Sequence, residues 1–448
     1  MIFDFSNFQL YVNMILSIII TVLVGIIIIR PMRAMQLDEY KNKLYLDYLF
    51  GAYRLKFLSV VAYCLAIFAI CFSIMNLILS LTNDYFLINL SILPFIVFSC
   101  IFALMNYKQK YKVPFKFTKR FTRLFVVNLA LYFIICFLII SIFTNYIKLI
   151  GVSITCVILL LSYFILPFAN LILKPIETLI NKSYINKAKN KLKDYKNLIK
   201  IGITGSYGKT STKFILSKML ESKYNVCKSE KSFNTQMGVV KTILNDLKPY
   251  HDVLIVEMGA NVKNDIKKLC NIVSPNYGIV TAVGNQHLRT FKTISNLITT
   301  KYQLVSEVEK NNGFIVLNAD SKNCMEFYKK AKCEKMITSL SNFSADMFAM
   351  DVVTDLDCTT FNLYTQSEKV VCKTKLLGKS YIEDIVLASA MAYKLGVSLN
   401  EIQIAISRLT PVEHRLEKID KGEYTILDDA FNSNYNGFLN ALEVLSTF

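Results

Sequence analysis

Long apolar runs fill the first part of the chain, and shorter apolar runs separated by polar turns fill the rest. Before residue 175, several runs are long enough to cross a bilayer, which takes about 20 apolar residues each. After residue 200, apolar runs of strand length alternate with amphipathic helical stretches, which is typical of an α/β protein. The pattern therefore predicts an N-terminal multi-span α-helical membrane region followed by an α/β domain. The five predicted spans lie near residues 11–29, 57–80, 86–106, 124–144 and 149–172.

The same pattern divides the chain into four parts. Short alternating runs at 359–364 and 370–374 predict a small antiparallel sheet beside the mostly parallel sheet of the α/β domain. The last strand and helix are too few for a domain of their own, so they are expected to begin a truncated C-terminal domain. The expected parts are a membrane domain at 1–173, an amphipathic linker helix at 174–199, a central domain at 200–418 and the start of the C-terminal domain at 419–448.

Basic residues predict how the membrane region is oriented. The 30–56 loop carries six Lys or Arg residues and the 107–123 loop carries seven, whereas the connections 82–85 and 145–148 hold a single Lys between them. The positive-inside rule then places the N-terminus outside and everything after the fifth span in the cytoplasm, at the inner cell membrane. The Lys-rich 174–199 helix is expected to lie on the anionic inner surface, with a solvated connecting helix as the alternative.

Composition narrows the function classes. The net charge of +18 lies largely beside apolar segments, so a membrane surface explains it better than nucleic acid does. The eleven cysteines form no CxxC pair, so neither a disulfide framework nor a zinc site is expected. The spans contain almost no ionisable residues, which argues against a transporter.

The stretch Thr204 to Thr212, TGSYGKTST, has the pattern of a phosphate-binding loop between a strand and a helix. Its glycines, Gly205 and Gly208, permit close approach of a ligand, and its backbone N–H groups can surround a phosphate. Lys209 is expected to reach the β/γ-phosphates, and the Thr210 hydroxyl to bind Mg²⁺. Ile203 stands where the strict pattern has a further glycine. The remaining loop residues in the predicted nucleotide site are Ser206, Tyr207 and Ser211.

Polar residues after other predicted strands extend this site. Glu257 ends an apolar strand, where open α/β sheets place their ligands, and it could hold a metal ion; a solvent-facing Glu is the alternative. His287, one of three histidines, follows the next buried strand and is a second candidate, although a lone His is more often structural. Lys301 lies on a helical run and, by itself, has the pattern of a surface lysine.

Six motifs in this order resemble those of the Mur ligase family, ATP-dependent enzymes that form amide bonds in peptidoglycan synthesis. The resemblance is nearest to the branch that adds D-Ala-D-Ala to a UDP-muramoyl-tripeptide, and it covers about residues 198–448. The motifs are TGSYGKTST at 204–212, NTQMG at 234–238, VEMGAN at 256–261, His287-Leu288 with Lys301 downstream, EHRLE at 413–417 and DDAFNSN at 428–434.

The resemblance implies roles by matched position. Thr210, Glu257 and His287 would hold or approach two magnesium ions, and Lys301 matches a lysine that is carbamylated in several family members. Asn234, Arg415, Asp429 and Asn432 match positions near the nucleotide or the domain interface. Lys209, His287 and Lys301 are the catalytic candidates. The implied reaction is phosphoryl transfer from ATP to a carboxylate, followed by attack of an amine on the acyl phosphate.

The sequence departs from the family at both ends. The predicted spans stand where the family has its UDP-binding domain. A lipid-linked precursor is therefore a candidate substrate in addition to a UDP-linked one. The expected partners are this precursor and an amino acid or a dipeptide such as D-Ala-D-Ala. The competing hypothesis is a catalytically inactive, nucleotide-binding membrane scaffold for cell-wall enzymes.

Overall fold

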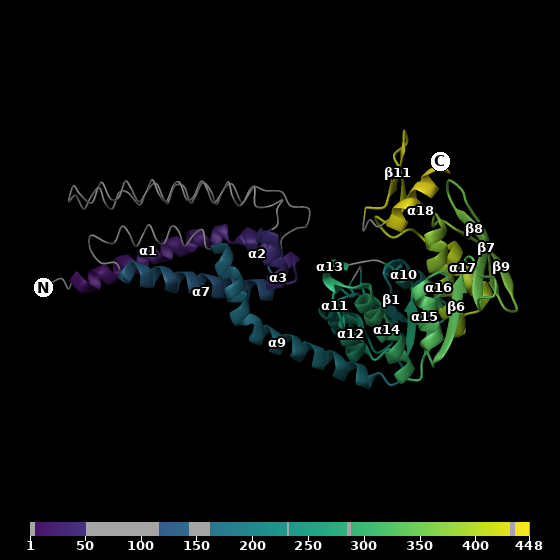
Figure 1. Ribbon diagram of the computed structural model, residues 1–448, viewed down its shortest axis with the longest axis horizontal. Coiled ribbons are helices and arrows are strands. Elements are labelled where there is room, and N and C mark those ends of the chain that lie inside the picture. Colours follow the sequence, from purple (N-terminus) through teal and green to yellow (C-terminus); the bar gives the residue numbers. More distant parts are fainter. Residues whose placement is uncertain are drawn as a thin grey trace. The chain divides into compact units, whose positions relative to one another are not determined.

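The computed structural model describes residues 5–50, 116–142, 162–230, 233–284, 288–430 and 435–447 (Figure 1). The chain forms two compact units, Met1–Ile180 and Asn181–Phe448.

The first unit is built from helices whose apolar side chains pack on one another. α1 packs along α7, and the short α2 that follows α1 also contacts α7. The Gln36 side chain donates a hydrogen bond to the Lys116 carbonyl over 3.1 Å, so the end of α2 meets the segment that precedes α7. α1 and α7 therefore run in opposite directions. The described helices of this unit are α1 (Phe5–Ile27), α2 (Ile29–Leu37), α3 (Asn42–Phe50), α7 (Lys119–Ile142) and the first part of α9 (Ser162–Asp194).

Two of the five predicted spans coincide with described helices. α7, at the predicted span 124–144, is the one described helix that alone is long and apolar enough to cross a bilayer. Asn13–Ile26 and Pro31–Leu37, bent by 46°, pass that test only as a pair and cover the predicted span 11–29. The predicted spans 57–80 and 86–106 lie outside the described residues, and 149–172 is described only from Ser162. A multi-span membrane region stays a prediction.

The described end of the last predicted span and most of the predicted linker form one helix. α9 continues from Ser162 to Asp194 through Pro167 and Pro175, so the expected boundary at 173/174 falls inside it. The apolar positions of its last turns are not on a free surface, because Ala188 and Leu192 pack into a core of the second unit. The expectation of a membrane-surface helix ending at 199 is therefore wrong for this end of the segment, where burial against the sheet domain stabilises the helix.

The second unit is organised around one nine-stranded sheet with the order β2-β3-β1-β4-β5-β6-β7-β8-β9. The pairs from β2 to β7 are parallel, and β7, β8 and β9 pair antiparallel. The expected antiparallel strands are thus present and extend the parallel sheet. The strands are β1 (Ile199–Thr204), β2 (Val226–Lys228), β3 (Val253–Glu257), β4 (Tyr277–Val280), β5 (Phe314–Asn318), β6 (Glu334–Ser339), β7 (Met347–Thr354), β8 (Thr359–Thr365) and β9 (Lys369–Thr374).

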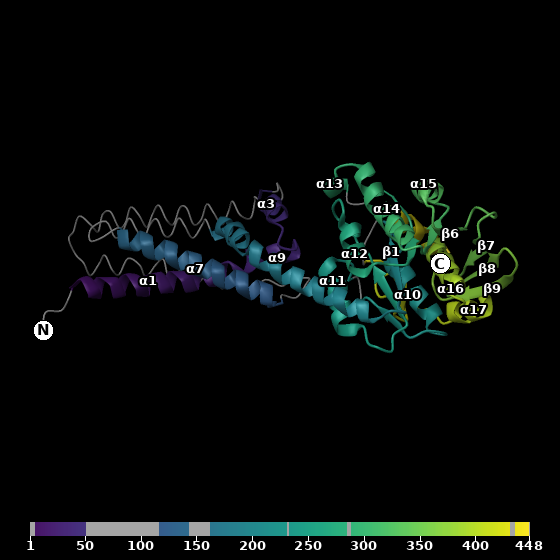
Figure 2. The same cartoon turned by 90° about the horizontal axis from the view of Figure 1, so that it is seen from below.

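Helices cover both faces of this sheet (Figures 1 and 2). Successive strand side chains point to opposite faces, so Val253 and Ile255 enter one core while Leu254 and Val256 enter the other. α10, α16 and α17 contribute to the first core, and α11, α12, α14, α15 and the end of α9 to the second. The helices are α10 (Lys209–Leu220), α11 (Gln236–Lys241) with a π-helical turn (Thr242–Asp246), α12 (Asp265–Val273), α13 (Leu288–Phe291), α14 (Ile294–Lys310), α15 (Lys322–Lys330), α16 (Lys379–Lys394) and α17 (Leu399–Ser407).

The end of the chain forms a separate small element. β10 (Glu417–Asp420) and β11 (Thr425–Asp428) pair antiparallel, and α18 (Tyr435–Leu445) follows them. Val444 of α18 packs into the core beside α16.

In the nine-stranded sheet, β1 lies between β3 and β4, so the carboxyl ends of these three parallel strands meet at one edge. The predicted phosphate loop follows the end of β1, and Glu257 is the last residue of β3.

Candidate functional site

The predicted phosphate loop connects the carboxyl end of β1 to the first turn of α10. Gly208 precedes the helix in the left-handed region, with φ of 78°, and a Cβ there would lie 2.1 Å from Asp384 Oδ1. A Cβ on Gly205 would lie 1.9 Å from Thr281 Oγ1. The loop is therefore enclosed between the end of β4 and helix α16, which leaves room for glycine alone at both positions. Its N–H groups are held at a helix N-terminus, the arrangement that binds anions.

Two lysines converge on the carbonyl groups of this loop. Lys209 Nζ donates to Gly205 O over 2.8 Å and to Ser206 O over 3.2 Å, and Lys301 Nζ donates to the same Gly205 O over 2.7 Å. Lys301 is only 3% exposed, so it is not the surface lysine that its helical pattern allows. Burial lowers the pKa of Lys301 well below its ordinary value, and the positive charge of Lys209 lowers it further. Burial also lowers the pKa of Lys209, which the Glu257 carboxylate opposes.

A buried carboxylate completes the site at the end of β3. Glu257 is 1% exposed, so the alternative of a solvent-facing strand end is wrong. Thr210 Oγ1 donates to its Oε2 over 3.0 Å, and Asn234 Nδ2 donates to its Oε1 over 3.0 Å. Hydroxyl and carboxylate oxygens side by side at a phosphate loop are the ligands that Mg²⁺ prefers. The two predicted metal ligands, Thr210 and Glu257, are thus brought together.

The structure adds a residue that the sequence reasoning missed. Lys213 Nζ lies 3.3 Å from Glu257 Oε2 and is fully buried. Its position one helical turn after Lys209 gave it the pattern of an ordinary polar residue on an amphipathic helix. The only available signal was that spacing, which puts both lysines on one side of α10.

A cavity of about 220 Å³ opens beside the loop. Arg415 and Asp429, which were expected near the nucleotide, line it together with Gly208 and Ser211. Tyr207, another expected loop residue, also lines the cavity, whereas Asn234 lies at the Glu257 carboxylate instead. Ser206 turns away from the cavity, because its Oγ donates to Gly284 O over 2.9 Å and ties the loop to the segment after β4.

Two neighbouring carboxyl groups on α16 face this cavity and have perturbed pKa values. Burial raises the pKa of Glu383 to about 7, with a smaller contribution from the negative charge of Asp320. Burial also raises the pKa of Asp384 well above its ordinary value, although Thr212 Oγ1 donates to Asp384 Oδ1 over 3.0 Å. Protonation of these groups would reduce their repulsion of a bound phosphate.

Two predicted residues, His287 and Asn432, lie outside the described residues. Their roles stay predictions.

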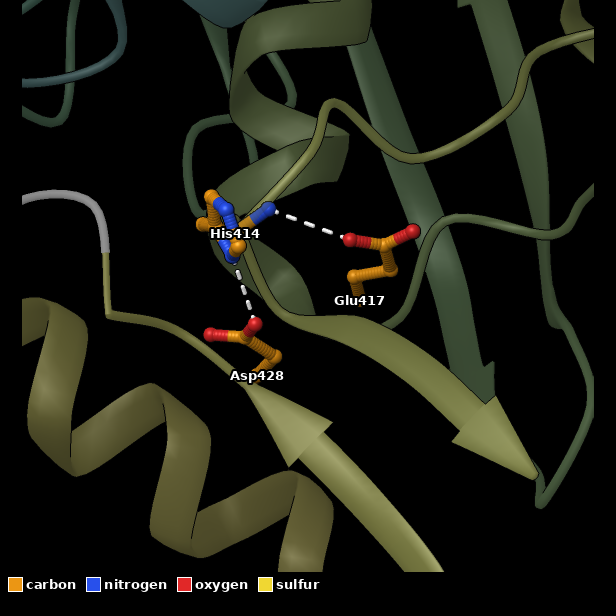
Figure 3. Close-up of side chains that lie close together, drawn as sticks. All are labelled: His414, Glu417 and Asp428. Carbon is orange, nitrogen blue, oxygen red and sulfur yellow. Dashed lines mark hydrogen bonds and ion pairs between the residues drawn. The ribbon is translucent and has the colours of Figure 1, made fainter. Parts of the chain in front are cut away.

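His414 belongs to a separate polar cluster at the base of the β10–β11 pair (Figure 3). Its Nδ1 lies 2.6 Å from Asp428 Oδ2, and its backbone N–H donates to Glu417 Oε2 over 3.1 Å. The His414 side chain is 52% exposed, and the hydrogen bond to Asp428 raises its pKa. These hydrogen bonds hold the segment before β10 against the end of β11, and so position the neighbouring Arg415 and Asp429 at the cavity.

Comparisons with known proteins agree with this geometry. Residues 203–392 match the Mur ligase middle domain family. The chain is 28% identical over 262 residues to UDP-N-acetylmuramoyl-tripeptide–D-alanyl-D-alanine ligase of Buchnera aphidicola, covering 58% of this chain and 56% of that protein. It is 31% identical over 249 residues to the Mycobacterium bovis protein of the same name, covering 55% of this chain and 48% of that protein. The chain thus spans about half the length of the curated relatives it matches.

Solved structures match over a similar share of the chain. MurF from Acinetobacter baumannii superposes with a TM-score of 0.57 at 23% identity, covering 60% of this chain and 58% of that one, and it supports the fold alone. The MurF ligase from Thermotoga maritima in complex with ADP superposes with a TM-score of 0.55 at 25% identity, covering 60% of this chain and 61% of that one.

Proposed function

We propose, from the premise that residues 203–392 are a Mur ligase middle domain, that this protein is an ATP-dependent amide-bond ligase of peptidoglycan precursor synthesis. One observation carries the proposal: a phosphate loop, the buried Thr210–Glu257 oxygen pair and two loop-directed lysines meet at one sheet edge. The curated relatives described above are named UDP-N-acetylmuramoyl-tripeptide–D-alanyl-D-alanine ligases, and a similar MurF ligase was solved with ADP.

The chain's own residues suit the chemistry of phosphoryl transfer. The loop amides and Lys209 bind the phosphates of ATP, and the cavity beside Arg415 and Asp429 receives the rest of the nucleotide. The γ-phosphoryl group passes to a substrate carboxylate, ADP leaves, and an amine then displaces phosphate from the acyl phosphate to form the amide. Both reactants of the first step are anionic, so fixed positive charge at the loop lowers the barrier.

The residues at the carboxyl end of β3 fit a magnesium ion. Thr210 and Glu257 would hold Mg²⁺, which neutralises phosphate charge when bound. We extend the proposal to a second ion near His287 and Lys301. The lowered pKa of Lys301 favours its neutral amine, which can add to CO₂ and release a proton, giving an anionic carbamate that can serve as an oxygen ligand.

We also propose that the protein acts at the inner face of the cell membrane. Large apolar side chains are exposed along both α1 and α7, including Ile15, Val22, Ile134 and Ile142, as expected of lipid-facing helices. Basic residues gather where α2 meets the start of α7, and the positive-inside rule assigns that end to the cytoplasm. A lipid-linked precursor is then a candidate substrate, as is a UDP-linked one.

An ADP-release assay tests the ligase proposal. The full-length protein is supplied with ATP, Mg²⁺, D-Ala-D-Ala and either a UDP-linked or a lipid-linked muramoyl-peptide precursor. ADP release that requires both precursor and dipeptide, and that is lost in Lys209→Ala, supports the ligase and identifies the carrier. ATP binding without turnover on either precursor would favour the catalytically inactive membrane scaffold instead.

Membrane placement has its own test. Single cysteines at Ser6, which precedes the first predicted span, and in the loop after α15 are treated with a membrane-impermeant thiol reagent, in intact cells and in inverted vesicles, after the native cysteines are replaced. Labelling of the first position only in intact cells, and of the second only in inverted vesicles, is expected. The reverse pattern, or a protein that does not sediment with membranes, would overturn this orientation.

A further inference from the structure

Lys213 is a fully buried lysine that the proposed reaction does not use. It lies on α10 one turn after Lys209, and its ammonium group is 3.3 Å from Glu257 Oε2. The same carboxylate oxygen accepts the Thr210 hydroxyl over 3.0 Å. The face of the Phe214 ring, 4.8 Å from Nζ to the ring centroid, covers another side of the ammonium group.

This position indicates that Lys213 acts through Glu257. The side chain is completely inaccessible and does not line the cavity beside Arg415, whereas the loop-directed lysine is Lys209. The nearby Lys228 is occupied elsewhere, since its Nζ donates to Ser217 Oγ over 2.9 Å. Among the described residues, Lys213 alone forms an ion pair with Glu257.

A buried carboxylate and a buried ammonium group stabilise one another when they form an ion pair. Moving either ion out of water costs several kcal/mol, which a close partner of opposite charge offsets. Glu257 also accepts hydrogen bonds from Thr210 and Asn234, but both donors are neutral. Among the described residues, Lys213 is the ammonium group in ion-pair contact with this carboxylate, whereas Lys209 interacts with it electrostatically without a direct ion pair.

We propose that Lys213 is a positioning residue, an internal counter-cation that keeps the Glu257 carboxylate buried and directed at Thr210 while no metal ion is bound. The inference rests on the proposed function, because it requires that Thr210 and Glu257 hold a divalent cation. A Mg²⁺ ion held by Thr210 and Glu257 would supply part of this charge compensation. The lysine thus keeps the metal ligands in place between catalytic cycles.

The Lys213→Met variant has a specific expected phenotype. Methionine fills a similar volume but leaves Glu257 without its ion-pair partner, so the region around β3 and α10 becomes less stable in the absence of metal. A divalent cation can restore that charge, and a ligand that binds only the folded state stabilises it. Magnesium should therefore protect the variant more than it protects the wild-type protein.

Hydrogen exchange followed by mass spectrometry measures this local stability in the full-length protein, held in detergent micelles with EDTA or with excess MgCl₂. In EDTA, peptides from α10 and β3 of Lys213→Met should exchange about 10²-fold faster than in the wild-type protein, the loss expected when a buried pair is broken. Excess MgCl₂ should recover at least about tenfold of this protection, and should change the wild-type peptides less.

Two further variants serve as controls. Lys228→Met removes a lysine near α10 that donates a hydrogen bond to Ser217. Hydrogen exchange in this variant should respond to Mg²⁺ as it does in the wild-type protein. Lys213→Met/Glu257→Gln removes both charges, and it should be more protected in EDTA than Lys213→Met while losing the response to Mg²⁺.

The outcomes separate the inference from the proposed function. Wild-type binding of ADP with Mg²⁺ is measured in parallel by equilibrium dialysis. If the wild-type protein binds this nucleotide and Lys213→Met exchanges equally fast with EDTA and with Mg²⁺, the lysine is only a structural group and the inference fails alone. If the wild-type protein binds no nucleotide with Mg²⁺, the inference and the proposed function fail together.

Discussion

Gly208 allows a quantitative test of how the phosphate loop is enclosed. Gly208→Ala places a methyl group at a residue with φ of 78° and 2.1 Å from Asp384 Oδ1. The left-handed backbone costs about 1–2 kcal/mol for an L-residue. The contact must also displace Asp384, which loses its hydrogen bond with Thr212, and leaving a buried polar group without its partner costs about 1–3 kcal/mol. The sum predicts a destabilisation of about 2–5 kcal/mol.

Gly396 offers a matched control within the same domain. It has φ of 81°, but a Cβ there would meet only Lys223 Nζ, the mobile end of a long side chain, at 2.6 Å. Gly396→Ala should therefore show the backbone cost of about 1–2 kcal/mol without the fixed contact. The difference between the two variants isolates the effect of Asp384.

Thermal unfolding followed by circular dichroism measures both variants, with ADP binding by equilibrium dialysis in parallel. For a domain of this size about 1 kcal/mol shifts Tm by ~2–4 °C, so Gly208→Ala should melt at least ~2 °C below Gly396→Ala. Only Gly208→Ala should lose ADP binding. Equal melting temperatures, or ADP binding by Gly208→Ala at the wild-type affinity, would refute the enclosed loop described above.

Three further predictions concern charged groups around the loop. Lys209→Ala should lower ADP release by at least ~10²-fold, on the scale of electrostatic catalytic groups, with the fold retained by circular dichroism; release at the wild-type rate would contradict its phosphate-binding role. Glu383 has a raised pKa of about 7, so the folded state favours its protonated form, and stability should fall as the pH rises from its unfolded pKa through 7. Glu383→Gln should remove that decline in urea titrations between pH 5 and 8, and an unchanged pH dependence would show that another group causes it. Lys301→Met should keep the free energy of unfolding within about 1 kcal/mol of the wild-type value, since a buried ammonium is replaced by an apolar chain of similar volume; it should nevertheless abolish ADP release and any ¹³C carbamate signal from labelled bicarbonate, and full activity would exclude a role for Lys301.

Local patterns were enough to predict much of the second unit. The β1–loop–α10 segment follows from an apolar run, two glycines and an amphipathic helix at fixed spacing, because each depends on neighbouring residues only. Thr210 and Glu257 were each predicted as a metal ligand from the local pattern, and the family resemblance implied that they hold the same magnesium ions. Arg415 and Asp429 came from a family resemblance, not from any local pattern.

Long-range packing decided what the sequence left open. Lys213 and Lys301 have the spacing of surface lysines, and only the docking of their helices on the sheet buries them against Glu257 and Gly205. The end of α9 has the pattern of a membrane-surface helix, yet Ala188 and Leu192 pack into the second unit. Local periodicity reports which face of a helix is apolar, but the surface that covers that face is set by residues far away in the chain. The sequence by itself therefore determined the phosphate loop and its strand-end carboxylate, whereas the tertiary structure decided which charges surround them.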